Sequence, residues 1–133
     1  MISISIRPSR YSHEIINASK EFVINIPNEE MIDACGFCGN NSGRDFDKFK
    51  ELSLTKEKGF IVSCPIIKEY PVNIECKVRQ IIHLGTHDMF RGEVVSVEAD
   101  EEVIYSDGEI DYERISMLSH LMDHYFKNML IKK

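Results

Sequence analysis

Two long segments of alternating apolar and polar residues, joined by a short turn, most constrain what this chain can fold into. Residues 72–82 and 90–99 each alternate at the period of a β-strand. The residues between them, 85–88, include Gly85 and are few enough for a hairpin loop. We therefore expect two antiparallel strands at the centre of the fold, with Cys76 buried on their apolar face.

The start of the chain predicts a further strand that runs into a turn and a short helix. Residues 2–6 alternate isoleucine with serine, Pro8 cannot continue a sheet, and a helical pattern follows at 12–19. Hydroxyl groups at this point, that of Ser12 among them, are expected to cap the helix. The helix N–H groups, the helix dipole and nearby arginines such as Arg10 would also suit a phosphate. The alternative is a capped helix with solvated arginines.

Three acceptor side chains predict where later helices begin. Asn28 is expected to cap a second helix that ends at Gly36, and Asp45 is expected to cap a short third helix. Asp111 is expected to cap a last helix that continues through residues 116–128, because apolar residues recur there at helical spacing. Shorter strands are expected at 22–26, 60–62, 66–67 and 103–105.

The length and net charge of the chain limit the number of domains, the fold class and the kinds of partner that can be expected. A single domain covering residues 1–133 is the default at this length, and the strand-rich pattern predicts a mostly β fold with flanking helices, a barrel or a sandwich. The net charge of −6, with no basic patch, excludes duplex nucleic acid as an expected partner.

No apolar run reaches the length of a membrane span, and no signal-peptide pattern precedes the first strand. The four cysteines are therefore interpreted as reduced thiols. We expect a cytoplasmic protein.

Five ordered sequence blocks resemble the flavin reductase-like family, and most closely its flavoredoxin branch. The resemblance covers roughly residues 1–102, and several ordered blocks are more specific than any single motif. The blocks are SIRPSRYSH at 5–13, EFVINIP at 21–27, SGRDFDKF at 42–49, PVNIECKV at 71–78 and GTHDMFRGEVV at 85–95. The resemblance implies a split β-barrel that binds FMN, usually across a homodimer. Relatives place a strand hairpin before the first matched strand, so this barrel is expected to be N-terminally shortened and part of its flavin pocket missing.

The same resemblance implies roles for individual residues. Ser12 stands where the family has a hydroxyl residue of the flavin site, and Lys48 stands at the family's lysine, where a cation complements the phosphate or a flavin carbonyl. His87 stands at the family's histidine beside the flavin, where it could bond the ring system or the nicotinamide, and it is the expected catalytic residue. Arg10 joins the cofactor-binding set from its charge and position.

The implied function is that of an FMN-binding oxidoreductase or electron carrier. A hydride would pass from NAD(P)H to the flavin, and the reduced flavin would then reduce an unknown acceptor. The alternative is a non-catalytic dimeric split-barrel remnant with an incomplete flavin pocket. The family's N-terminal hairpin carries a tryptophan of the pocket, and this sequence contains no tryptophan.

Two other patterns could carry chemistry. Cys35 and Cys38 form a CxxC, which can be a redox pair or half of a zinc site. Zinc would need two more ligands, and no second CxxC supplies them. His120 and His124 are four residues apart on the expected last helix, a spacing that can bind a divalent metal, but two polar residues on the wet side of an amphipathic helix are the simpler explanation. No metal site is assigned.

Overall fold

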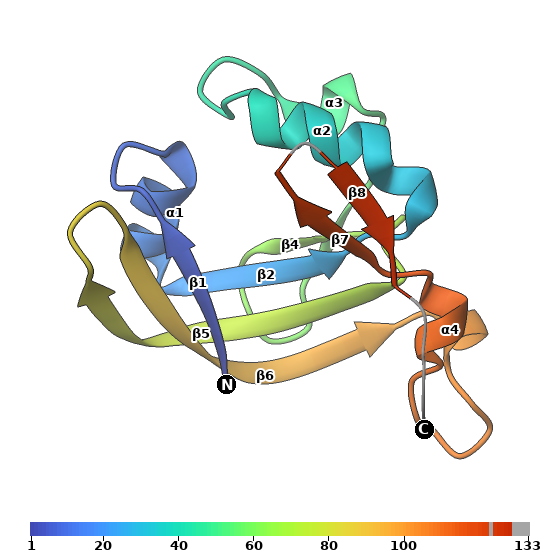
Figure 1. Ribbon diagram of the computed structural model, residues 1–133. Coiled ribbons are helices and arrows are strands. Elements are labelled where there is room, and N and C mark those ends of the chain that lie inside the picture. The colour runs from blue at the N-terminus through green and yellow to red at the C-terminus, as the bar shows by residue number, and fades with distance from the viewer. Residues whose placement is uncertain (123, 129–133) are drawn as a thin grey trace.

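Four antiparallel strands form the central sheet of the computed structural model, in the order β1-β6-β5-β2 (Figure 1). The structure describes residues 1–122 and 124–128. The expected mostly β fold with flanking helices is confirmed. The four strands are β1 (Ile2–Ile6), β2 (Glu21–Ile26), β5 (Val72–His83) and β6 (Asp88–Ala99).

The β5–β6 hairpin is the longest part of the sheet, and two irregularities bend it. The pairing register shifts after Glu75 and again after Val78. An extra residue on one strand of a pair bends that strand and increases the twist, so the sheet curls into a half-barrel (Figure 1). The predicted turn is confirmed: Gly85 takes a left-handed φ of 83°, which glycine adopts at no steric penalty.

The main core lies between the curled sheet and the helix that follows β1. Phe22, Cys76 and Phe90 of the sheet pack with Ile16 of that helix, and Cys76 is fully buried as predicted. The packing leaves no room at Gly92 of β6, where a Cβ atom would lie 2.6 Å from Cζ of Phe22. Position 92 therefore has to be glycine, because any larger residue would collide with the ring of Phe22.

Helix α1 (Tyr11–Ser19) follows β1 after the predicted turn, but no hydroxyl caps it. Its N-cap is Arg10, whose side chain makes no capping hydrogen bond. The expected hydroxyl cap is wrong because Ser12 lies within the first turn, past the position from which a side chain can cap. The helix ends at Lys20, where the backbone turns left-handed with a φ of 58°.

Helix α2 (Ile32–Asn40) lies above the sheet and begins as predicted (Figure 1). A 3₁₀ turn at Glu29–Met31 leads into it, and Asn28 caps this turn by accepting a hydrogen bond from the amide of Glu30 at 3.1 Å. The cap lies just after β2, so the chain leaves the sheet and enters the helix within a few residues.

The expected end of this helix at Gly36 is wrong. The helix continues across two glycines to Asn40, although each glycine costs about 1 kcal/mol relative to alanine in a helix interior. Two asparagine side chains help to hold its last turn: the amide nitrogen of Asn40 donates to the carbonyl of Gly36 at 2.9 Å, and that of Asn41 donates to the carbonyl of Phe37 at 2.9 Å. The backbone amide of Asn41 also donates to the carbonyl of Phe37 at 3.0 Å, so both backbone and side chains hold this end of the helix.

Helix α3 (Lys48–Glu51) begins two residues later than the sequence predicts. Its cap is Asp47, whose side chain accepts from the amide of Lys50 at 3.4 Å. Asp45 does not cap it because that residue lies in the preceding turn, where its own amide donates to the carbonyl of Ser42 at 3.1 Å.

The C-terminal part is a short helix and a β-hairpin, so the expected continuous helix at 116–128 is wrong. Asp111 caps the short helix as predicted, accepting from two backbone amides. The helix then stops because Ser116 takes a left-handed φ of 52°, and Met122 turns the chain again at a φ of 56°. Met129, one of the apolar residues of the expected helix, lies outside the described residues. The elements are α4 (Tyr112–Ile115), β7 (Leu118–Leu121) and β8 (His124–Lys127).

The strands expected at 60–62 and 103–105 do not form, whereas the one expected at 66–67 belongs to a short hairpin. Residues 60–62 do not form a strand because their amides donate to the carboxylate of Glu75 instead of to a neighbouring strand. At 103–105, the backbone forms a 3₁₀ turn and only an isolated bridge between Ile104 and Ile110. The strand expected at 66–67 is confirmed. The short hairpin pairs β3 (Lys56–Lys58) with β4 (Pro65–Ile67).

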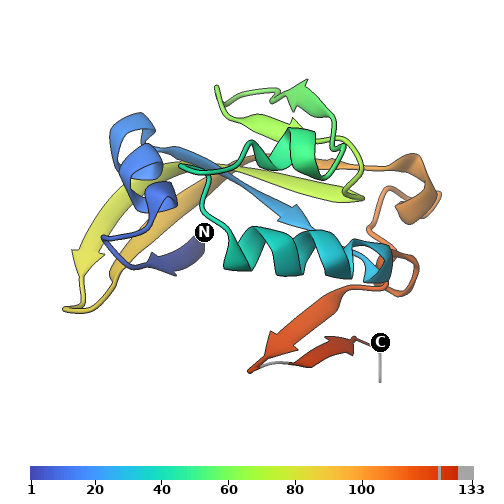
Figure 2. The ribbon, with the colours of Figure 1, turned by 90° about the horizontal axis from the view of Figure 1, so that it is seen from above.

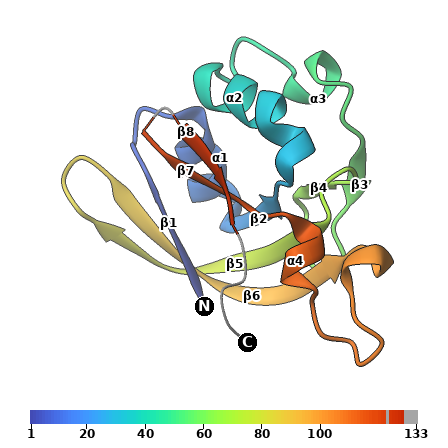
Figure 3. The same cartoon turned by 45° about the vertical axis from the view of Figure 1, so that its right-hand side comes forward.

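The β7–β8 hairpin lies alongside α2, as Figures 2 and 3 show from two directions. Lys127 of β8 forms an ion pair with Glu29 at 3.1 Å, and the hydroxyl of Tyr125 would lie 3.9 Å from a Cβ atom on Gly36 of α2. In the part of the chain that the structure describes, no helix is both long and apolar enough to span a bilayer.

Candidate functional site

A pocket of 280 Å³ lies between the start of α1, the end of α2 and the start of α3, and three of the predicted site residues line it. These are Arg10, the N-cap of α1; Ser12, in its first turn; and Lys48, the first residue of α3. The lining contains these two cations and no carboxylate, although the chain as a whole carries a net charge of −6. The local charge of the pocket is therefore positive.

The first turn of α1 adds backbone donors to this wall. The first amides of an α-helix have no acceptor four residues earlier in the helix, and here the N-cap side chain does not supply one. The amide of His13 donates to the carbonyl of Arg10 at 3.0 Å, which leaves the amides of Tyr11 and Ser12 as the candidate donors. The dipole of the nine-residue helix also favours negative charge at this end. The donor set of amides, a hydroxyl, an ammonium and a guanidinium matches the acceptor oxygens of a phosphate group.

Lys48 is held at the pocket by the last turn of α2. Its Nζ atom donates to the carbonyl oxygen of Cys38 at 2.6 Å. This carbonyl is among the last four of α2, which have no partner within the helix, and a cation also complements the negative end of the helix dipole. The ammonium group is thus positioned by the backbone of a neighbouring helix.

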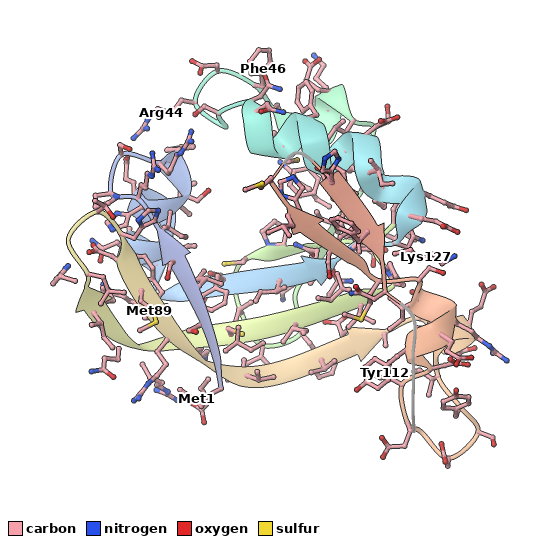
Figure 4. The ribbon with its side chains drawn as sticks, viewed as in Figure 1. Met1, Arg44, Phe46, Met89, Tyr112 and Lys127 are labelled. Carbon is pink, nitrogen blue, oxygen red and sulfur yellow. The ribbon has the colours of Figure 1, made fainter. Side chains whose placement is uncertain are left out.

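A second pocket of 520 Å³ adjoins the first and shares Tyr11, Ser12 and Lys48 with it. Arg44 lies on the loop between α2 and α3 (Figure 4), with its guanidinium carbon 4.9 Å from the centre of the Tyr11 ring. The same guanidinium pairs with the carboxylate of Glu14 at 2.5 Å. The loop is thereby tied to α1, and it forms one wall of both pockets.

His87 does not line either of these two pockets. It lies in the β5–β6 hairpin loop, where its Nε2 atom accepts from Nε of Arg7 at 3.4 Å and its Nδ1 atom is 3.0 Å from the hydroxyl of Thr86. Since Arg7 can only donate, the proton of a neutral imidazole sits on Nδ1. The structure therefore brings Arg10, Ser12 and Lys48 together and places His87 at a separate point.

Sequence reasoning missed a carboxylate that two histidines hold beside the start of α1. Asp88, at the first position of β6, accepts from Nε2 of His13 at 2.8 Å and from Nδ1 of His83 at 2.7 Å. The hydrogen bonds from His13 and then from His83 lower the pKa of Asp88 below its ordinary value. His13 also packs edge-on against Phe90, with 5.2 Å between ring centres, so the cluster fixes the first turn of α1 on the sheet.

A second carboxylate, Glu75 on β5, is completely buried beneath the loop at 60–62. It accepts from the amides of Phe60, Ile61 and Val62 at 2.6 to 2.8 Å. Burial acts to raise the pKa of Glu75, but the amide hydrogen bonds outweigh burial and the pKa lies below its ordinary value. Its neighbour Glu98 shows the opposite: burial and the hydrogen bond with Glu75 raise its pKa.

The metal alternatives find no geometric support. His120 and His124 lie on the two paired strands of the β7–β8 hairpin and not on one helix face, so the expected helical spacing does not exist. Cys35 and Cys38 lie on α2. Among residues 1–122 and 124–128, no three His, Cys, Asp or Glu side chains are grouped so that they could hold a metal ion.

The sequence profile of the flavin reductase like domain matches residues 1–114. The chain belongs to the flavin reductase-like family. The resemblance predicted from the sequence blocks is thus confirmed, and so is the split-barrel fold: flavoredoxin of Desulfovibrio vulgaris (Miyazaki F) superposes with a TM-score of 0.89 at 28% identity, covering 98% of this chain and 73% of that one. Flavoredoxin from Methanosarcina acetivorans superposes with a TM-score of 0.88 at 25% identity, covering 98% of this chain and 70% of that one.

Curated relatives are longer than the matched region. An uncharacterised protein of Archaeoglobus fulgidus is 33% identical over 111 residues, which are 84% of this chain and 62% of that protein. The high molecular weight rubredoxin of Moorella thermoacetica is 30% identical over 95 residues, 70% of this chain and 40% of that protein. The family is therefore established for this chain, whereas the activity of the longer relatives is not carried over with it.

Proposed function

We propose that this chain binds FMN, with the phosphate in the cation-lined pocket at the start of α1, and that it serves as a flavin-dependent oxidoreductase or electron carrier. The observation that carries the proposal is the lining of that pocket: two cations, a hydroxyl and uncapped helix amides, without a carboxylate. Such a donor set is suited to a phosphate dianion. Membership of the flavin reductase-like family gives the anion its chemical class.

Each residue of the pocket has a distinct part in holding the phosphate. The hydroxyl of Ser12 and the first amides of α1 donate to phosphate oxygens, and Arg10 adds a planar guanidinium. Lys48 contributes a charge that the carbonyl of Cys38 keeps in place before FMN arrives. When bound, the flavin ring supplies the hydride and electron chemistry, and the protein fixes its position and polarity.

We assign His87 the catalytic place beside the flavin ring or the nicotinamide of NAD(P)H. Arg7 and Thr86 hold its imidazole with the proton on Nδ1. In that tautomer the N–H group is held by Thr86 and the Nε2 lone pair by Arg7, so His87 is oriented before a ligand arrives. NAD(P)H is the proposed hydride donor, and the final electron acceptor is a separate partner.

The proposed assembly is a homodimer in which the second copy completes the flavin pocket. β1 forms one edge of the sheet, and in the described part of the chain no further strand pairs with it. An open edge favours pairing or covering by another chain. Light scattering coupled to size-exclusion chromatography measures the mass directly, and a monomer would contradict the assembly.

The alternative is a dimeric split barrel that no longer catalyses, with a flavin pocket too incomplete for FMN. The observation in its favour is the position of His87, outside the lining of the pocket that holds the other three predicted residues. Under this alternative the cation-lined pocket takes a small anion or none, and the protein does not reduce flavin with NAD(P)H.

A visible spectrum and a fluorescence titration separate the two functions. Purified protein is mixed with FMN, freed of excess ligand, and examined for the flavin absorption bands and for quenching of FMN fluorescence. The proposal predicts bound FMN, and it predicts that Lys48→Ala weakens binding by about 1.5–3 kcal/mol, the worth of a charge-assisted hydrogen bond.

The matched control is Lys50→Ala, which removes the same charge from the same helix but outside the pocket lining. That variant is expected to bind FMN as the wild type does. Colourless protein that leaves FMN fluorescence unchanged would exclude the flavin function and favour the alternative.

A further inference from the structure

The CxxC on α2 lies beside the cation-lined pocket, and the function proposed above makes no use of it. Cys38 lines the pocket, and its carbonyl oxygen is the acceptor for Lys48. Cys35 lies one turn earlier and is half-buried. Both residues are free thiols.

Three residues apart on a helix, the two thiols share a face but cannot be joined while the helix stays regular. Side chains at this spacing have Cβ atoms about 5–6 Å apart. A disulfide needs its Cβ atoms about 3.5–4.5 Å apart. Bond formation between Cys35 and Cys38 therefore requires the last turn of α2 to change shape.

The last turn of α2 is built so that it can change shape. Gly36 and Gly39 weaken the helix on either side of Cys38, and no residue of α2 is buried. The side chains of Asn40, Asn41 and Lys48 donate to carbonyl oxygens at this end of the helix, and the carbonyl of Cys38 is held by Lys48. These contacts can be broken without disturbing the core of the protein.

We propose that Cys35 and Cys38 form a reversible disulfide, and that this bond withdraws the carbonyl of Cys38 from Lys48 and lowers the affinity of the pocket for its anion. The thiol site stands on the placement of the two cysteines alone, whereas the effect on FMN rests on the function proposed above. The pair is a redox site adjoining the proposed cofactor site.

The chemistry is thiol–disulfide exchange with a small disulfide. The thiolate of Cys38, which lines the pocket, attacks one sulfur of the small disulfide and releases one small thiol. The Cys35 thiolate then attacks the Cys38 sulfur of the mixed disulfide and releases the second small thiol, so two protein thiols are oxidised and one small disulfide is reduced to two thiols. Burial raises the pKa of Cys35, which is consistent with the resolving rather than the attacking role.

A mass measurement tests the thiol pair without any flavin. The protein is equilibrated with oxidised or reduced glutathione, alkylated and cut with trypsin; residues 21–44 then form one peptide that holds both cysteines. Oxidation is expected to block alkylation of both thiols, so the peptide carries neither alkyl group and weighs about 2 Da less than the unalkylated dithiol peptide, the two hydrogen atoms lost. Continued alkylation of both thiols would overturn the proposal.

Hydrogen exchange and FMN titration then test the coupling. In the oxidised protein, amides at 36–44 are expected to exchange faster, and the dissociation constant for FMN is expected to rise about three- to tenfold because Lys48 is no longer pre-organised. Oxidation that changes neither the exchange rate nor the affinity would overturn the coupling.

Two variants serve as controls. The double variant Cys35→Ser/Cys38→Ser can form neither the disulfide nor a mixed disulfide with glutathione at this site, and its FMN affinity is expected to be independent of glutathione redox state. Cys64→Ser, elsewhere in the fold, is expected to keep the response. A wild-type response that persists in the double variant would place its cause at another thiol and overturn the assignment. If reduced protein binds no FMN, the proposed function fails, while the peptide mass and the exchange rates still decide the thiol site.

Discussion

Two regions of this molecule use backbone amides to meet negative charge, and they differ in where that charge comes from. At residues 60–62, three amides surround the carboxylate of Glu75, which is completely buried. At the start of α1, the amides have no side-chain cap, and Arg10 and Lys48 add positive charge around them.

The difference separates a structural anion from a ligand site. The loop at 60–62 has its anion supplied by the chain, so its donors are satisfied and the loop is fixed to β5. The pocket at α1 is lined by donors and cations without a carboxylate, and under the proposed function its anion is the phosphate of FMN. Variants on each side test this distinction.

The largest expected effect is the loss of the internal anion. Glu75→Ala leaves the buried amide of Val62 and the part-buried amides of Phe60 and Ile61 without this acceptor. At about 1–3 kcal/mol for each buried donor left unpaired, and less for part-buried ones, the free energy of unfolding should fall by about 3 kcal/mol. Urea unfolding measures the change. Glu75→Gln keeps one acceptor oxygen, so its free energy of unfolding should lie between those of the wild type and Glu75→Ala.

The matched control is Glu93→Ala on β6, which removes an exposed carboxylate paired with Arg79. Exposed pairs of this kind contribute about 0–1 kcal/mol. Equal losses in Glu75→Ala and Glu93→Ala would show that the amide cradle is not a structural anion site.

The second prediction concerns the carboxylate that fixes α1 to the sheet. Because hydrogen bonds from His13 and His83 lower the pKa of Asp88 below 3.8, the folded state favours the charged carboxylate. Its contribution to stability is complete above the ordinary pKa and is lost as the pH falls through the lower folded-state pKa. The difference in urea midpoint between wild type and Asp88→Asn should therefore be full near pH 5, about one unit above the ordinary pKa, and shrink in stronger acid. A difference that stays constant in acid would contradict this role.

A smaller effect is expected at the edge of the ligand pocket. Arg10→Ala should weaken FMN binding by about 1 kcal/mol, roughly fivefold, because its guanidinium is one of several phosphate donors. Riboflavin, which lacks the phosphate, should bind wild type and variant equally in the same fluorescence titration. Equal weakening for both ligands would place Arg10 at the ring rather than at the phosphate.

The smallest effect is expected at Ser12. Removing its hydroxyl in Ser12→Ala should weaken FMN binding by about 0.5–1 kcal/mol, since the amides of the same turn still donate. Fold stability should change little, because this hydroxyl does not cap the helix. A large loss of stability in this variant would mean that the side chain is structural.

The sequence predicted the parts of the fold that follow from local pattern. The alternation at 72–82 and 90–99 predicted the β5–β6 hairpin, and the side chains of Asn28 and Asp111 marked two helix caps correctly. The pattern at 116–128 wrongly predicted a continuous helix, because apolar spacing does not reveal that Ser116 adopts a left-handed backbone and ends the helix.

The parts that depend on distant contacts could not be predicted. Asp88 and His13 are 75 residues apart, and no spacing rule joins them. Glu75 lies on the polar face of its strand, which suggests solvent until the loop at 60–62 is seen to cover it. By contrast, Ser12 and Lys48 came from the family resemblance, and the structure places them at one pocket for the physical reason that α1 and α3 both begin there.

A paired titration tests directly whether the start of α1, with Lys48, holds a phosphate. The dissociation constants of FMN and riboflavin, which differ only by that phosphate, are measured on the same wild-type protein at low salt and again on Lys48→Ala. The wild type is expected to bind FMN at least about tenfold more tightly than riboflavin, and Lys48→Ala is expected to lose most of this preference. Equal affinity of the wild type for the two flavins would contradict a phosphate site at the start of α1.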